Sequence, residues 1–265
     1  MKRTVKMIST VLVAALMVGL LGNPMVKSEN EVQAATYSSN REYAVAELKK
    51  MADIQWKPTT KNLTIGNYTY YKNTVYKGMP YTTDYNTTYT DFISGKNGSF
   101  GSSGSNVFNY KGNEAVGNDC STVPALAWKL KFTTIKYANI YTGDYLACAK
   151  NGSNSTYHLA TVKNYRMGLA CDSTKDYIKG NRSTVRNALQ SLQKGDCCLY
   201  YYKKDGTLKK HVVFVVGTYS GGVYITDQIG RKSGDTNSSW RHSKAMSWDK
   251  LLDDGYVPIR CTDMG

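Results

Sequence analysis

Near the start of the chain, apolar positions recur with the period of a helix and predict one over residues 41–53. Ser39 or Asn40 is suited to cap this helix. The pattern stops at residues 56–58 (Trp-Lys-Pro), because a proline disfavours the helical conformation of the residue before it. The apolar face of the predicted helix consists of Ala44, Ala46, Leu48 and Met51.

The last third of the chain has the pattern of strands. Residues 211–216 (His-Val-Val-Phe-Val-Val) form a nearly continuous β-branched run, which is typical of a buried central strand. Further strands are predicted over residues 197–202 and 223–226, the latter after a turn at residues 220–222. With further helices predicted at 121–130 and 184–192, helices come first and antiparallel strands later, which favours an α+β fold.

Two polar segments separate the first helix from the second. Residues 62–90 are rich in Tyr, Thr and Asn and predict short strands and loops packed with aromatic side chains. Residues 95–105 are rich in Gly and Ser and predict a flexible loop. This loop is no phosphate-binding P-loop, because no Gly-Lys-Ser/Thr follows its glycines.

The N-terminal residues have the features of a secretory signal. A basic stretch at residues 1–6 precedes an apolar run at residues 8–21, which is too short to span a bilayer. Small residues follow, and cleavage is expected after Ala34 or Ala35. We therefore interpret residues 1–34 as a signal peptide and expect a secreted protein, extracellular or associated with the cell wall, with no stable membrane span after cleavage.

The charge of the chain is strongly positive. Removing the four Lys/Arg and two Asp/Glu of the signal segment from the net charge of +14 leaves +12 for the mature protein. Such a charge favours an acidic partner: nucleic acid, an anionic membrane or an anionic cell-wall polymer. The alternative is that the charge only keeps the protein soluble. No RNA-recognition or zinc-finger motif occurs, so we expect no nucleic-acid partner.

A candidate nucleophile lies where a polar turn meets an apolar run. Residues 117–121 (Gly-Asn-Asp-Cys-Ser) deliver Cys120 to the start of the helix predicted at 121–130, with Cys120 itself expected at the cap position. The free N–H groups and dipole of a helix start stabilise a thiolate and can hold an oxyanion. The competing interpretation is a buried structural cysteine.

The other cysteines allow disulfides in a secreted protein. If Cys120 is reserved for chemistry, an odd number remains, so at least one is free or pairs between chains. Those five are Cys148, Cys171, Cys197, Cys198 and Cys261.

A thiolate nucleophile needs a base within hydrogen-bond reach. The mature chain has three histidines, and His211 heads the predicted central strand. His158 and His242 lie in polar stretches and are interpreted as solvated or locally hydrogen-bonded rings. Asp227 closes the neighbouring strand and is our candidate to orient His211, with Gln228 as the alternative.

Four short motifs in order resemble the NlpC/P60 superfamily of papain-like cell-wall cysteine peptidases. They are residues 78–81 (Gly-Met-Pro-Tyr), 118–121, 194–196 (Lys-Gly-Asp) and 211–213. Residues 225–228 (Ile-Thr-Asp-Gln) are closer to the CHAP relatives, in which an acidic residue completes the triad. The resemblance covers residues 76–262.

The resemblance implies a papain-like α+β fold, in which the helix bearing the cysteine packs on a central antiparallel sheet. It implies a catalytic domain at residues 76–265, which leaves residues 35–75 as a helical extension. It also implies that Tyr81 lies near the cysteine and that Asp196 is a turn residue rather than a catalyst. The candidate substrate or oxyanion residues are Tyr81, Asp119, Ser121, Gln228 and Trp240.

The expected function is cleavage of amide bonds in peptidoglycan stem peptides by a Cys120-His211-Asp227 triad, in a monomer without cofactor. The alternatives are acyl transfer by the same thioester chemistry and a non-catalytic wall-binding protein. A metalloenzyme is disfavoured, because the chain contains neither His-Glu-x-x-His nor Cys-x-x-Cys.

Overall fold

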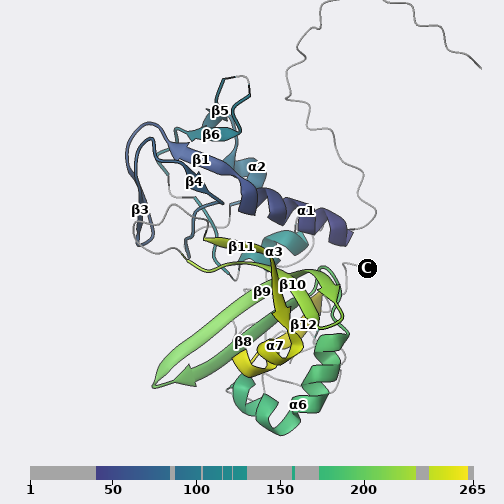
Figure 1. Ribbon diagram of the computed structural model, residues 1–265. Coiled ribbons are helices and arrows are strands. Elements are labelled where there is room, and N and C mark those ends of the chain that lie inside the picture. Colours follow the sequence, from purple (N-terminus) through teal and green to yellow (C-terminus); the bar gives the residue numbers. More distant parts are fainter. Residues whose placement is uncertain are drawn as a thin grey trace, which may run out of the picture. The chain divides into compact units, whose positions relative to one another are not determined.

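Helices and mostly antiparallel strands make up the computed structural model (Figure 1). The described residues belong to one compact unit, residues 37–265. They are residues 40–83, 87–102, 104–114, 116–120, 122–129, 157–158, 173–230 and 239–261. The predicted signal segment and Ser121 therefore lie outside the described residues.

The predicted α+β class is confirmed. The described helices are α1 (Asn40–Asp53), α2 (Tyr89–Phe92), α3 (Thr122–Lys129), α6 (Thr174–Gln190) and α7 (Trp248–Asp254). Strands β1 to β6 are Gln55–Pro58, Leu63–Ile65, Tyr68–Tyr70, Tyr76–Lys77, Gly98–Phe100 and Val107–Tyr110. Strands β7 to β12 are Tyr157–His158, Cys197–Lys204, Thr207–Tyr219, Gly222–Gln228, Trp240–Ser247 and Val257–Cys261. Among the described helices, none combines the length and apolar character that crossing a bilayer requires.

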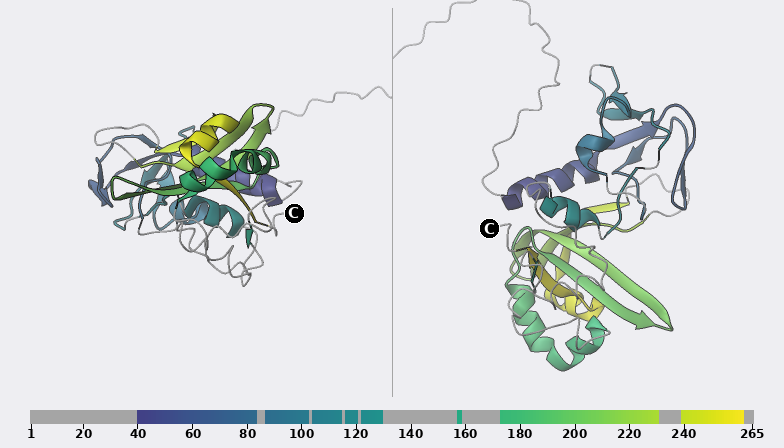
Figure 2. Two further views of the ribbon diagram at one scale, coloured as in Figure 1. Left: turned by 90° about the horizontal axis from the view of Figure 1, so that it is seen from below. Right: turned by 180° about the vertical axis from the view of Figure 1, so that it is seen from behind.

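The larger sheet is six-stranded and antiparallel, in the order β11-β10-β9-β8-β12-β7. Strand β9 lies inside it, and residues 212–216 are all buried, so the predicted central strand is confirmed. Helix α3 contacts β9 and α1, while α6 contacts β8, β12 and α7. In Figures 1 and 2 the hairpin of β8 and β9 extends beyond the other strands.

A four-stranded sheet has the order β4-β1-β6-β5, with β1 parallel to β6 and the other pairs antiparallel. Strands β2 and β3 form a separate antiparallel pair. Trp56 on β1 packs against four aromatic rings, which agrees with the aromatic packing expected for residues 62–90. Those rings belong to Tyr70, Tyr76, Phe92 and Tyr110. The six-stranded and four-stranded sheets contribute to one hydrophobic core. The domain boundary proposed at residue 76 therefore falls between strands of one sheet.

Helix α6 differs from its prediction, because it begins at Thr174 rather than Thr184. Ser173 caps it by accepting a hydrogen bond from the Asp176 N–H. Asn181 has non-helical dihedral angles that kink the helix. Gly180 and Asn181 are poor helix formers, so the sequence pattern revealed only the part beyond the kink.

The loop predicted over residues 95–105 contains strand β5 instead. β5 pairs with β6, and Gly98 lies opposite Tyr110 with φ of 148°. A Cβ atom at Gly98 would lie 2.0 Å from the Asn109 carbonyl oxygen. The glycine is therefore required for close approach of two strands, and its presence does not indicate flexibility here.

Candidate active site

Cys120 follows a helix cap formed by Asp119. The Asp119 carboxylate accepts a hydrogen bond from the Thr122 N–H at 2.8 Å, and the Asp119 carbonyl accepts from Val123 N at 3.3 Å. The Asp119 N–H in turn donates to Thr122 Oγ1 at 2.9 Å. The cap is therefore one residue earlier than predicted, and Cys120 is the first residue of the helical turn.

Pro124 explains why the regular helix is delayed to Thr122. It has no N–H to donate to the Cys120 carbonyl, so the hydrogen bond that would extend α3 to Cys120 is missing. The Cys120 N–H, at the first helical position, has no acceptor within the helix. It is a natural donor to an oxyanion beside the sulfur.

The segment before Cys120 is fixed to Pro80, Thr82 and Thr87 by hydrogen bonds. Asn118 is fully buried, and its side chain bonds the Thr87 N–H and C=O, each at 2.9 Å. Its backbone bonds Pro80 O at 3.1 Å and Thr82 N at 2.9 Å. A Cβ at Gly117, where φ is 146°, would lie 2.3 Å from Pro80 O. This close approach brings Tyr81 beside the cysteine.

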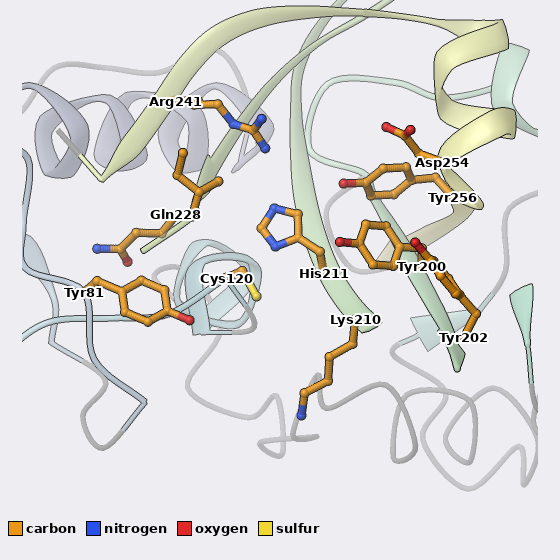
Figure 3. A pocket seen from close by; sticks show the side chains of 11 residues that line it. Tyr81, Cys120, Tyr200, Tyr202, Lys210, His211, Gln228, Arg241, Asp254 and Tyr256 are labelled. Carbon is orange, nitrogen blue, oxygen red and sulfur yellow. The ribbon is translucent and has the colours of Figure 1, made fainter. Parts of the chain in front are cut away.

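His211 is where β9 changes from an exposed to a buried strand. Residues 207–210 are exposed and residues 212–216 are buried. The strand thus begins four residues before the head position that the sequence indicated. His211 Nε2 lies 2.5 Å from Asp227 Oδ2, which leaves Nδ1 as the ring nitrogen available for the hydrogen bond with Cys120. Figure 3 shows the imidazole beside the cysteine sulfur.

Asp227 is fully buried and has two partners. It contacts His211 on one side and Arg241 on the other, where Arg241 Nε donates to Oδ1 at 2.9 Å and Nη2 donates to Oδ2. Burial raises the pKa of Asp227, but the bonds from His211 and Arg241 outweigh burial and lower it. The carboxylate is therefore ionised in the folded protein.

The same pairing favours a protonated His211. Burial lowers the pKa of His211, yet the hydrogen bonds to Asp227 and Cys120, together with their charges, raise it to about 9. At neutral pH the ring is therefore an imidazolium, which is the form that pairs with a thiolate.

Gln228 faces away from His211, as strand alternation requires. Its Nε2 donates to the carbonyls of Met79 and Pro80, each at 2.9 Å. Its Oε1 is buried and has no hydrogen-bond partner in the described part of the chain. The contact predicted for an orienting residue is therefore made by Asp227, and Gln228 joins β10 to the segment that follows β4.

A pocket of about 490 Å³ opens beside Cys120 and His211 (Figure 3). Burial raises the pKa of Tyr200 and of Tyr256, so both remain neutral phenols at neutral pH. The Tyr81 hydroxyl points toward the cysteine in Figure 3. The pocket is lined by Tyr81, Cys120, Tyr200, Tyr202, Lys210, His211, Gln228, Ile229, Arg241, Asp254 and Tyr256.

Other candidate residues have structural contacts. Trp240 is buried and its indole donates to Met79 O at 3.0 Å, so it does not line the pocket. Asp119 is the helix cap. Asp196, expected to be a turn residue, accepts from the Gln193 N–H at 2.8 Å and contacts Arg41 at 3.1 Å.

Of the two remaining histidines, His242 is not among the residues that line the pocket. His158 belongs to β7, which pairs with β12. His242 lies on β11 and is half-buried, and Nδ1 is buried without a hydrogen-bond partner in the described ranges. Burial is the main reason that the pKa of His242 is lowered.

Cys120, Cys197 and Cys198 are thiols and not members of disulfides. Cys197 and Cys198 are fully buried, and burial raises the pKa of Cys198. Cys120 is partly exposed in the pocket. Cys148 and Cys171 lie outside the described residues.

Arg241 is the site residue that sequence reasoning missed. It lies directly opposite Asp227 in the β10–β11 register, as an opposite-charge pair across two strands. The pairing of Arg241 with Asp227 could be inferred from the sequence only after residues 240–247 were recognised as a strand.

Within the described residues, no group of three or more His, Cys, Asp or Glu side chains is arranged to hold a metal ion. Comparison of the chain with protein-family models, with curated proteins and with solved structures gives no match.

Proposed function

We propose that this chain is a secreted cysteine hydrolase of the papain-like NlpC/P60 type, which cleaves amide bonds in peptidoglycan stem peptides. One observation carries the proposal. Residues from three separate segments, Cys120, His211 and Asp227, form a continuous chain of contacts, and Cys120 and His211 line the pocket. This is the nucleophile, base and orienting acid that thiol acyl chemistry requires.

The raised pKa of His211 supports a resting ion pair between the Cys120 thiolate and the His211 imidazolium. The thiolate attacks the amide carbonyl, a sulfur–carbon bond forms, and the carbonyl electron pair moves to oxygen. When the tetrahedral intermediate collapses, the carbon–nitrogen bond breaks and His211 gives its proton to the departing amine. A thioester on Cys120 and a neutral imidazole remain.

Hydrolysis of the thioester returns the enzyme to its first state. Neutral His211 takes a proton from water, the resulting hydroxide attacks the thioester carbon, and the carbon–sulfur bond breaks. The products are a carboxylic acid, a thiolate and an imidazolium. Asp227 holds the ring orientation through both steps and stabilises its positive charge.

Two donors are placed to stabilise the oxyanion. One is the Cys120 N–H at the start of the helical turn, and the other is the Tyr81 hydroxyl, which is directed at the cysteine in Figure 3. Gln228 is not a donor here, since its amide hydrogens are used by the Met79 and Pro80 carbonyls.

The substrate class is supported by the surroundings of the site and by the sequence. Four tyrosines line the pocket together with Lys210, His211 and Arg241, and the whole chain has a net charge of +14. Anionic wall polymers fit such a charge, and the predicted signal segment fits an extracellular location.

The deciding experiment compares the mature protein with Cys120→Ala on purified peptidoglycan, with released fragments identified by mass spectrometry. We expect fragments with new amine and carboxylate ends from the wild type and none from Cys120→Ala. Fragments joined by new amide bonds would identify acyl transfer instead. Wall binding without cleavage by either protein would identify a binding protein, and loss of activity with chelator that zinc restores would identify a metalloenzyme.

A further inference from the structure

The β8–β9 hairpin continues outward from the active site as an isolated pair of strands. On one side, β12 pairs with β8 only as far as Leu199. On the other side, β10 pairs with β9 only from Phe214 onward. Residues 200–211, called here the arm, are therefore two-stranded, and Figures 1 and 2 show the arm extending from the sheet.

One face of the arm continues the face that bears His211. Tyr200 lies opposite His211, and Tyr202 lies opposite Lys209. Lys204 is two residues further along the same strand. Directly opposed residues and alternate residues of a strand share a face. Outward from His211 and Tyr200, this face presents Tyr202 with Lys209 and then Lys204. Each step of two residues covers about 7 Å.

The outer end of this face is positively charged. Lys204 and Lys209 are exposed, and Lys175 from α6 places Nζ 4.4 Å from the centre of the Tyr202 ring. The lysine ion pairs in the described part of the chain involve other lysines. We call Tyr202, Lys175, Lys204 and Lys209 the outer subsite.

Nearby carboxylates do not cancel this charge. Asp254 lines the pocket, but its carboxylate is bonded by Lys250 at 2.8 Å. Asp205 is the one acidic residue of the arm and lies in the turn at its tip, whereas the arm contains four lysines, Lys203, Lys204, Lys209 and Lys210. The arm therefore presents a net positive charge beside the pocket.

We propose that the outer subsite binds a carboxylate of the substrate while the carbonyl to be attacked lies at Cys120. This inference rests on the proposed function and specifies its substrate. The subsite is about 7 to 14 Å from His211 along the arm, which an extended peptide covers in two to four residues. A stem peptide with a free carboxylate at that distance is preferred to the same peptide with an amide.

A pair of thiol-directed peptides tests the subsite without knowledge of the natural substrate. Chloroacetyl-Gly-Gly-Gly and its C-terminal amide each alkylate a thiolate with loss of chloride and differ only in the distant carboxylate. At low ionic strength we expect the acid to alkylate Cys120 in the full chain about three- to tenfold faster than the amide, and high salt to remove the difference.

The variants assign this preference to the subsite. In Lys204→Gln/Lys209→Gln the ratio of the two rates should fall close to one. The matched control is Lys203→Gln/Lys61→Gln, which loses the same charge from the opposite face of the arm and from a remote exposed loop. The control should keep the wild-type ratio. Equal ratios of the two rates in the two double variants would overturn the proposal. The lysines would then serve only to prevent the exposed strand edges from pairing with another chain.

Failure of the proposed function can be distinguished from failure of the outer subsite. If Cys120 in the wild type is inert toward both peptides, the cysteine chemistry is wrong, and the same peptides are then titrated into Cys120→Ala and followed by NMR. Chemical-shift changes in the arm with the acid, and weaker ones with the amide, would support the subsite. Identical changes with both peptides, or none with either, would overturn it.

Discussion

Arg241 and Asp227 face each other across strands β10 and β11, and the guanidinium donates to both oxygens of the carboxylate. One of these oxygens, Oδ2, also lies 2.5 Å from His211 Nε2. The carboxylate that orients the histidine is thus itself oriented by the arginine. Arg241 is a positioning residue in this arrangement, since it acts on His211 through Asp227.

Two replacements of Arg241 separate the effect of its positive charge from the effect of its two hydrogen bonds to Asp227. In Arg241→Met the buried carboxylate loses two hydrogen bonds, so the pKa of Asp227 should rise and the acid limb of the pH–rate profile should move to higher pH. Turnover at its optimum should fall by about tenfold or more, since a charge-assisted hydrogen bond contributes about 1.5–3 kcal/mol.

Arg241→Lys is the matched variant, because it keeps the positive charge without the two-point geometry. It should restore the position of the acid limb while recovering only part of the rate. A variant with an unchanged pH profile and merely a lower melting temperature would show that Arg241 serves stability alone.

Replacing Asp227 and replacing Gln228 should have different effects, although the two residues are adjacent. Asp227→Ala should slow turnover by about 10²- to 10⁴-fold, less than loss of Cys120 or His211, because the ring loses its orientation and the support of its charge. It should also slow alkylation of the Cys120 thiol at a pH near 6. Asp227→Asn should recover part of the rate, because an amide oxygen still accepts the ring N–H.

Gln228→Ala is the control for Asp227. It removes the bonds to the Met79 and Pro80 carbonyls, so it should lower the free energy of unfolding by about 1–3 kcal/mol without changing the pH–rate profile. Both effects are measured by denaturant unfolding and by turnover against pH. Severe loss of turnover in Gln228→Ala, with nearly normal turnover in Asp227→Ala, would contradict the site described above.

The outcome for particular residues shows what a sequence pattern can and cannot determine. The run at residues 212–216 predicted a central strand because β-branched residues fit a sheet buried on both faces. Alternation along β10 separated Asp227 from Gln228 once the strand was known. Arg241 depends instead on which residue of a distant strand lies opposite Asp227, and this register is fixed only by the assembled sheet. Periodicity within one segment does not contain that information.

Thiol reactivity should distinguish Cys120 from Cys197 and Cys198. Iodoacetamide at a pH near 6 should label Cys120 much faster than Cys197 and Cys198, because Cys120 is partly exposed beside an imidazolium and the other two are fully buried. Peptide mapping by mass spectrometry gives the rate for each site. His211→Ala should slow labelling of Cys120 alone, and equal rates at all three cysteines in the folded wild type would exclude Cys120 as an activated nucleophile.

Two histidines should affect stability with opposite dependence on pH. The folded-state pKa of His211 is raised from 6.5 to about 9, so the folded state binds its proton more tightly than the unfolded state does. The resulting stabilisation is fully present below pH 6.5 and is lost as the pH rises through about 9. The pKa of His242 is lowered from 6.5, mainly by burial, so protonation of the unfolded state makes its contribution unfavourable as the pH falls below 6.5.

Urea unfolding of wild type, His211→Gln and His242→Gln between pH 5 and about 10 tests both signs, because stability varies with pH according to the protons bound in each state. Relative to wild type, His211→Gln should be most destabilised at the acid end, and the difference should shrink as the pH rises through about 9. His242→Gln should lose part of the acid destabilisation and match the wild-type slope at alkaline pH. The difference in unfolding free energy between wild type and His211→Gln could instead be independent of pH. In that case His211 would not be an imidazolium in the folded state, and the ion pair assigned to the resting enzyme would be wrong.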